Sequence, residues 1–216
     1  SRVLDCPSHT HLRVCDRVLQ YLSGSANFAL RLDGRSGPLE LIAHSDSDWA
    51  GCVDTRQSTS GRVTMMQGAA VVWSSTRQRS IALSSAEAEM VAASDAARDV
   101  RYVRRLLASV SLPIHHPAPL YVDNASALQW ANKKAKWSAS RHISTRHFCL
   151  QEWKRAGHIL PLKVATNRQL ADIMTKALPQ ALFSVMRAQL MNYREPVYDL
   201  REALTAPRRA DAAPAA

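Results

Sequence analysis

Leu41-Ile-Ala-His-Ser-Asp-Ser-Asp-Trp-Ala-Gly-Cys-Val-Asp54 is a short apolar run that leads into two aspartates and breaks at a glycine. An apolar run of this length beside turn residues predicts a buried β-strand. Side chains alternate along a strand, so Asp46 and Asp48 point to the same face. A carboxylate at the end of a core strand is costly to bury unless a metal ion, an arginine or a helix N-terminus offsets its charge. Another group is therefore expected to converge on this strand.

The composition describes a basic chain with room for one real core. Its 216 residues suit one domain of about 150 residues with appendages. The net charge of +10 and the pI of about 10.0 favour a polyanionic partner. The four cysteines lie far apart without a Cys-x-x-Cys pair, which argues against a zinc knuckle or a disulfide framework and suits a reducing compartment. With no apolar run long enough for a bilayer and no signal peptide, the sequence predicts a soluble protein.

Basic residues are concentrated between positions 132 and 155, with tryptophans among them. Such a run often forms only a solvated face. Aromatic rings among cations also form nucleic-acid surfaces, because rings stack on bases while cations hold phosphates. Both interpretations stay open, since the tryptophans equally suit a core. The basic residues are Lys133, Lys134, Lys136, Arg141, Arg146, Lys154 and Arg155, and the tryptophans are Trp130, Trp137 and Trp153.

Hydrophobic periodicity predicts an N-terminal helix followed by alternating strands and helices. Strands are expected over 28–32, 40–45, 62–67, 70–74, 119–123 and 159–164, with Gly68 in a hairpin. Helices are expected over 9–22, 84–110, 124–131, 143–156, 170–178 and 183–190. The three successive strands between 40 and 74 have short links, which predicts an antiparallel meander.

One glutamate falls on the apolar stripe of the helix over 84–110. The helix begins with Ser84-Ser-Ala-Glu87, which matches a capping box. At 100° per residue, Glu89 lies at the centre of the apolar stripe and therefore faces the sheet. It could there approach Asp46, or it could pair with an arginine such as Arg62 or Arg79. Both interpretations stay open.

Two further aspartates lie near predicted element boundaries. Asp123 ends an apolar strand, and Asn124 opens the helix that follows. Thr166-Asn-Arg-Gln169 matches a second capping box, and Asp172 lies in the early turns of the next predicted helix, off its buried side. An acid in that place contributes roughly a few tenths of a kcal/mol through the helix dipole, so Asp172 alone carries little functional information.

Six blocks of sequence, in this order, resemble the ribonuclease H domain of Ty1/copia-type retrotransposon polyproteins. They are Ser45-Asp-Ser-Asp-Trp-Ala-Gly51, Arg56-Gln-Ser-Thr-Ser-Gly61, Ala82-Leu-Ser-Ser-Ala-Glu-Ala-Glu89, Tyr121-Val-Asp-Asn124, Arg141-His-Ile-Ser-Thr-Arg-His147 and Gln169-Leu-Ala-Asp-Ile-Met-Thr-Lys176. The resemblance implies an α/β, ribonuclease H-like fold: a mixed five-stranded sheet, antiparallel meander plus parallel strands, flanked by helices. It places this domain at residues 39–178.

The remaining segments lie outside that domain. Residues 1–38 are expected to form an N-terminal helix and connector, since His11–Leu32 resembles the segment that follows the reverse transcriptase in these polyproteins. Residues 179–204 are expected to form a C-terminal helical extension. Residues 205–216 are rich in Ala, Pro and Arg and are expected to be a disordered tail.

The resemblance implies an endonuclease that hydrolyses the RNA strand of RNA–DNA hybrids during reverse transcription. The implied catalytic residues, which are also the metal ligands, are Asp46, Glu89, Asp123 and Asp172. Two Mg²⁺ ions about 4 Å apart, for which Mn²⁺ could substitute, activate a water and stabilise the leaving oxygen. In this scheme Asp46 bridges both ions, Glu89 and Asp123 hold the leaving-group side, and Asp172 holds the other ion. Asp48 is the alternative for the first position.

The implied partners are an RNA–DNA hybrid, recognised through its 2′-hydroxyls, and the reverse transcriptase domain of the parent polyprotein. No membrane and no small-molecule cofactor are expected. The expected location is the cytoplasm, in a retrotransposon particle, or the nucleus. Candidate nucleic-acid contacts are Ser84, Ser85, Asn124, Lys133, Lys134, Lys136 and Arg141, although the cap role alone already explains Ser84.

Two other functions compete with this one. A domesticated copy would bind nucleic acid or a protein without cutting; the presence of all four acids favours activity. An integrase or exonuclease would place its acids on different elements.

Some features of the sequence depart from the family pattern or limit what the resemblance implies. Residues 165–167 leave no room for the mobile histidine loop of many cellular relatives, and Arg62 replaces a usual aromatic. His142 and His147 are spaced so that they miss a common helix face, which disfavours zinc.

Overall fold

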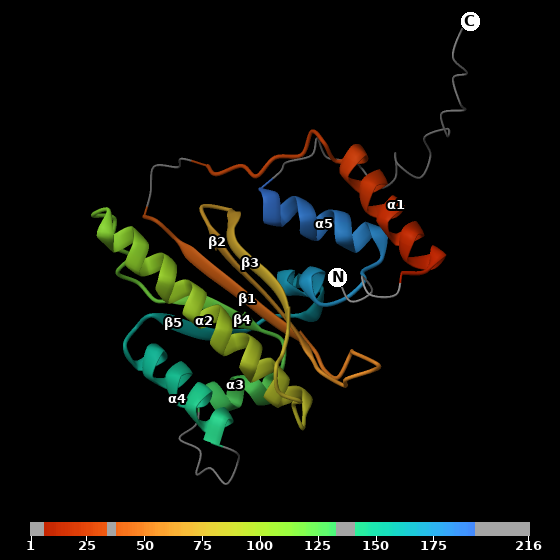
Figure 1. Ribbon diagram of the computed structural model, residues 1–216. Helices are drawn as coiled ribbons and strands as arrows, with labels where there is room; N and C mark the ends of the chain where they lie inside the picture. Colours follow the sequence, from red (N-terminus) through yellow and green to blue (C-terminus); the bar gives the residue numbers. More distant parts are fainter. Residues whose placement is uncertain (1–6, 34–37, 133–140, 193–216) are drawn as a thin grey trace, which may run out of the picture.

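The computed structural model describes residues 7–33, 38–132 and 141–192 and contains a five-stranded sheet in the order β3-β2-β1-β4-β5 (Figure 1). The strands are β1 (Leu41–Asp48), β2 (Thr59–Met66), β3 (Ala69–Arg77), β4 (Ala118–Val122) and β5 (Ile159–Lys163). The first three strands are antiparallel neighbours, whereas β4 runs parallel to β1 and β5 runs parallel to β4. This confirms the expected mixed sheet with an antiparallel meander.

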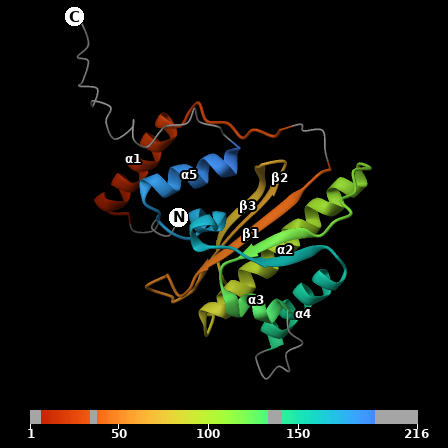
Figure 2. The ribbon, with the colours of Figure 1, turned by 180° about the vertical axis from the view of Figure 1, so that it is seen from behind.

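Helices lie on both faces of this sheet (Figures 1 and 2). One face is covered by α2 (Ser85–Ser109), α3 (Ala125–Asn132) and α4 (Arg141–Arg155). The other face is covered by two 3₁₀ segments, η1 (Thr166–Arg168) and η2 (Leu170–Met174), and by α5 (Gln180–Met191). The N-terminal α1 (His9–Gly24) lies beside α5, where the rings of Tyr21 and Phe183 meet edge to face with centroids 5.9 Å apart.

Each face has its own hydrophobic core. Under α2, the stripe of alanines and valines packs on Leu41 and Ala43 of β1 and on Leu120 of β4. Under η2 and α5, Val63 and Met65 of β2 pack on apolar side chains of the C-terminal segments. Because Leu41 and Ala43 face α2, strand alternation turns Asp46 to the face of η2. The carboxyl end of β1 is thus enclosed from both sides.

The C-terminal part of the predicted domain differs from the sequence-based expectation. Instead of an α-helix over 170–178, the chain forms the two short 3₁₀ segments. Gln169, rather than Thr166, caps the second segment, since its side chain accepts a hydrogen bond from the Ala171 N–H. Pro179 follows soon after and lacks the N–H needed to extend a helix, so the stretch is too short for a stable α-helix.

The predicted strand over 28–32 is also absent. Arg31 donates its backbone N–H to the carbonyl of Met191 at the end of α5, so its partner is a helix terminus and not a strand. The hairpin prediction is confirmed: Gln67 and Gly68, with φ of 48° and 85°, form the turn between β2 and β3. Of the capping box at Ser84, only the serine half forms, because Glu87 accepts from the N–H of Leu83 instead of Ser84.

No helix among the described residues is long and apolar enough to cross a lipid bilayer.

Candidate metal centre

Asp46 lies near the carboxyl end of β1 and is almost completely buried. Its Oδ2 accepts a hydrogen bond from Thr175 Oγ1, and the Lys176 ammonium lies 3.4 Å from its Oδ1. Both partners follow directly after η2, which packs on the sheet at this point. The chain itself therefore supplies some of the offsetting charge that a buried carboxylate requires.

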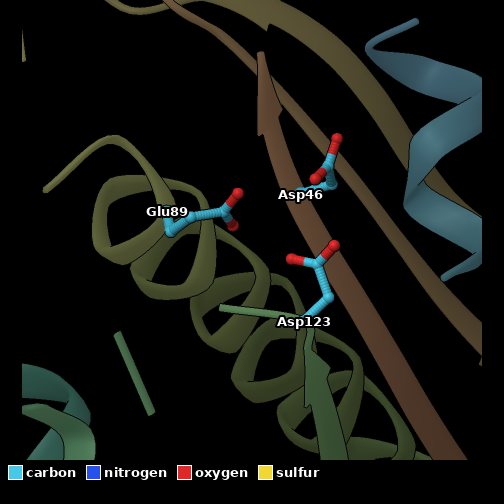
Figure 3. A group of neighbouring side chains, drawn as sticks. All are labelled: Asp46, Glu89 and Asp123. Carbon is cyan, nitrogen blue, oxygen red and sulfur yellow. The ribbon is translucent and has the colours of Figure 1, made fainter. Parts of the chain in front are cut away.

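Glu89 enters the same region from the second turn of α2 (Figure 3). Its Oε1 accepts a hydrogen bond from the Ser47 N–H at 3.2 Å, whereas Oε2 is buried with no partner among the described residues. Burial, followed by the charges of Asp46 and Asp123, raises the pKa of Glu89 to about 8. Arg62 pairs with Asp99 instead, so the approach of Glu89 to Asp46 is the interpretation that the structure supports.

Asp123 follows the last residue of β4, and its side chain points toward Asp46 (Figure 3). The next residue, Asn124, caps α3 by accepting from the backbone N–H groups of Ser126 and Ala127. This cap fixes the chain direction directly after Asp123. Burial and the nearby charge of Asp46 raise the pKa of the Asp123 carboxyl.

The three acids offer one oxygen each within 4.8 Å of one another, from β1, α2 and the loop after β4 (Figure 3). Three carboxylates so close repel each other when ionised, and this repulsion adds to the effect of burial, which is the main cause of the raised pKa of Glu89. A divalent cation would reverse this effect and would satisfy the orphaned oxygen of Glu89. Carboxylate oxygens are the donors that Mg²⁺ prefers, so these residues fit such an ion.

Asp172 lies outside this group of three but is linked to it through Lys176. The Lys176 ammonium is 3.1 Å from Asp172 Oδ1 and contacts Asp46 as well. The expectation that Asp172 lies off the buried side is wrong: η2 packs tightly on the sheet and leaves the residue 3% exposed. Burial first, then the charge of Asp46, raises the pKa of Asp172 to about 6. Burial alone would lower the pKa of Lys176, but the charges of both aspartates raise it.

A buried amide joins the strands that carry these acids. Gln169 Nε2 donates to the carbonyl oxygens of Ser45 at 2.9 Å and Tyr121 at 3.3 Å, and its Oε1 lies 3.0 Å from His44 Nδ1. The residue thus connects β1, β4 and η2 just before the acids. Burial lowers the pKa of His44 to about 4, so its imidazole is neutral at pH 7.

Sequence reasoning missed the roles of Thr175, Lys176 and Gln169 beside the acids. One signal was present for the lysine, because Asp172 and Lys176 are four residues apart, the spacing at which opposite charges meet on a helical turn. Asp48 is half-buried and lies outside the group of three acids; its carboxylate contacts Gly51 in the following turn.

The candidate nucleic-acid contacts are only partly described. Ser84 caps α2 through its hydroxyl, Ser85 is exposed, and the Asn124 side-chain oxygen is taken up by the α3 cap. Lys133, Lys134 and Lys136 lie outside the described residues, as do the side chains of Arg141, His142 and His147. Trp153 packs against the core, with the Arg101 guanidinium 4.8 Å above its ring, which favours the structural role for this tryptophan.

A cavity of about 250 Å³ lies at the other end of α2 and is lined by Arg101, Arg104 and Arg105 among others. Fifteen residues of helix, or about 22 Å, separate Arg104 from Glu89. This cavity is therefore not part of the acidic centre.

The strand order, the strand directions and the helices on both faces define a ribonuclease H-like fold. Among solved structures, the N-terminal RNase H domain of a Mycobacterium tuberculosis protein matches with a TM-score of 0.48 and 10% identity, over 69% of this chain and 96% of that one. LC11-RNase H1, isolated from compost and solved in complex with an RNA/DNA hybrid, gives 0.47 and 13%, over 63% and 94%.

Curated relatives define the family, although no family model matches the chain. Retrovirus-related Pol polyproteins from transposons RE1 and RE2 of Arabidopsis thaliana are 29% and 30% identical over 91% and 85% of this chain. The corresponding polyprotein from transposon TNT 1-94 of Nicotiana tabacum is 30% identical over 87%. The chain belongs to these Copia-type retrovirus-related Pol polyproteins, and it spans only 12 to 14% of the length of these three relatives.

Proposed function

We propose that the chain is an endonuclease that hydrolyses the RNA strand of RNA–DNA hybrids with two divalent cations, Mg²⁺ or Mn²⁺. The observation that carries this proposal is the convergence of Asp46, Glu89 and Asp123 within 4.8 Å, from three separate elements. Buried acids are costly, and of these three only Asp46 is paired with a lysine among the described residues, so their assembly at one end of the sheet is best explained by a cationic ligand.

In this proposal each acid has a defined role. Asp46, Glu89 and Asp123 would hold one ion, and Asp46 together with Asp172 would hold the second. When bound, the ions would supply an activated water and offset the charge on the leaving 3′ oxygen. The protein contributes orientation: the Ser47 N–H fixes one oxygen of Glu89, and Thr175 fixes one oxygen of Asp46.

The proposed substrate and partner rest on the net charge of the chain and on the family to which it belongs. A net charge of +10 suits a nucleic-acid duplex, and the exposed Ser85 at the N-terminus of α2 is available for a phosphate. Because its relatives are Pol polyproteins, we assign the protein to retrotransposon reverse transcription, with the reverse transcriptase domain as partner. Its place would be the cytoplasmic retrotransposon particle or the nucleus.

A second candidate function is a non-catalytic module that binds nucleic acid. The contact of Lys176 with both Asp46 and Asp172 favours this alternative, since a lysine at this point would keep out one of the two ions. In this alternative the chain would be a domesticated retroelement copy that has lost its nuclease activity.

A cleavage assay separates these functions. An RNA–DNA hybrid labelled on the RNA strand is incubated with Mg²⁺ and either the native chain, Asp46→Asn or Glu87→Gln. Glu87 lies on the same helix as Glu89 but outside the acidic group, so its variant is the matched control. We expect the native chain and Glu87→Gln to cut the RNA and Asp46→Asn to leave it intact. Cutting by all three would exclude Asp46 as a ligand, and binding of the hybrid without cutting would establish the second function.

A further inference from the structure

The ammonium group of Lys176 lies between two of the proposed metal ligands. Its Nζ is 3.1 Å from Asp172 Oδ1 and 3.4 Å from both carboxylate oxygens of Asp46. The two aspartate side chains are almost fully buried, whereas the lysine side chain is 38% exposed. The chain therefore already places one of its own cations between Asp46 and Asp172.

The local backbone fixes this arrangement. Lys176 donates its backbone N–H to the carbonyl of Asp172 at 3.0 Å, so the two residues occupy successive turns with their side chains on one side. The preceding residue, Thr175, donates its hydroxyl to Asp46 and holds that carboxylate against the end of η2. The lysine contact is thus built by the same segment that positions Asp46 and Asp172.

The other half of the acidic centre differs in this respect. Neither Glu89 nor Asp123 forms an ion pair with another described residue, and one oxygen of Glu89 is buried without a hydrogen bond. A cation entering between Asp46, Glu89 and Asp123 meets three acids, of which only Asp46 is paired with the ammonium of Lys176 among the described residues. A cation entering between Asp46 and Asp172 meets the ammonium, and two cations a few ångströms apart repel strongly.

We propose that Lys176 occupies the second cation position and thereby makes metal binding sequential. This inference rests on the proposed function and specifies how that site loads. The first divalent ion binds between Asp46, Glu89 and Asp123. The second binds between Asp46 and Asp172 only after the ammonium has withdrawn. Withdrawal toward solvent is open to the lysine, because its side chain is 38% exposed and its four-carbon stem is intrinsically flexible.

Titration of the full chain with Mn²⁺ tests this order, with free Mn²⁺ followed by electron paramagnetic resonance. We expect the native chain to bind one ion tightly and a second one at least about tenfold more weakly, because of the repulsion by the ammonium. Lys176→Met and Lys176→Gln remove the charge and should tighten the second site by about tenfold or more. Lys176→Arg retains the charge and should behave like the native chain.

Lys163→Met is the matched control for net charge. Lys163 lies at the end of β5 and adds to the field at Asp123, but it forms no ion pair with a described acid, so its loss should leave the second affinity within about twofold. If both neutral Lys176 variants bound the second Mn²⁺ ion with the same affinity as the native chain, the inference would be overturned. In that case, the loss of one of the two Mn²⁺ sites in Glu89→Gln would still support the metal centre itself. Absence of Mn²⁺ binding in every variant would overturn both. Circular dichroism confirms that each variant is folded.

Discussion

Gly61 lies directly opposite Asp46 in the antiparallel register of β1 and β2, at the point where η2 rests on the sheet. A Cβ atom at Gly61 would come within 2.6 Å of Thr175 Cγ2 and 2.7 Å of the Ala171 carbonyl oxygen. The missing side chain is therefore what allows Thr175 to reach Asp46. One small residue sets the distance between the strand that carries the first acid and the segment that carries the fourth.

Gly61→Ala should accordingly disturb stability and metal binding together. Because backbone and side-chain atoms of η2 stand in the way, overpacking should lower the free energy of unfolding by about 1–3 kcal/mol. The shift of Thr175 and Asp172 should also weaken Mn²⁺ binding. Urea unfolding and Mn²⁺ titration measure the two effects. Gly24→Ala is the control, since nothing lies within 4 Å of its Cβ position, and it should be neutral or slightly stabilising. Equal stability of the two variants would refute this account of Gly61.

Gln169→Met should destabilise the chain although it preserves the volume of the side chain. The substitution leaves the carbonyls of Ser45 and Tyr121 buried without the amide donor, at a cost of about 1–3 kcal/mol. The midpoint of urea unfolding measures the loss. Gln189→Met, at an exposed site on α5, should change the free energy of unfolding by less than about 0.5 kcal/mol. A loss at Gln189 that matches the loss at Gln169 would show that the buried amide has no special role.

Local sequence pattern was sufficient for the five strands and for the placement of three of the four acids, although it also predicted a strand over 28–32 that does not form; the mixed strand arrangement came from the family resemblance. The apolar run before Asp46 and the one before Asp123 mark strand ends, and the helical period turns Glu89 toward the sheet. The burial of Asp172 depends instead on contacts over more than a hundred residues, through Gly61 and the amide of Gln169. A single sequence does not contain these distances, so local pattern favoured an α-helix with Asp172 outside.

Divalent ions should stabilise the folded chain through the acidic centre. A ligand that binds only the folded state adds about 2.7 kcal/mol at a hundred times its dissociation constant, so Mg²⁺ should raise the melting temperature. Asp123→Asn replaces one of the three converging carboxylates by a neutral amide and should abolish most of this increase. Differential scanning calorimetry with Mg²⁺ and with EDTA measures the effect. Glu87→Gln should keep the full increase. An equal Mg²⁺ effect in Asp123→Asn would remove Asp123 from the centre.

The raised pKa of Glu89 predicts how metal-free stability depends on pH. Its folded-state pKa of about 8 lies above the ordinary value of 4.5, so the folded state keeps a proton that the unfolded state has released. Stability should then fall as pH rises through this range, by at most about 1.4 kcal/mol per pH unit. Asp172 acts in the same direction, but only up to its pKa of about 6. The lowered pKa of His44, about 4 instead of 6.5, acts oppositely below pH 6.5.

Between pH 6.5 and 8, Glu89 contributes a decline in stability, and the variant Glu89→Gln isolates that contribution. The glutamine cannot ionise, so in EDTA the variant should lose less stability than the native chain over this interval and should be the more stable of the two at pH 8. Urea unfolding at pH 6.5, 7.2 and 8 measures the difference. Saturating Mg²⁺ should remove the native decline, because the bound cation favours the ionised carboxylate. Parallel pH curves for the two chains in EDTA would show that Glu89 is not protonated in the folded state.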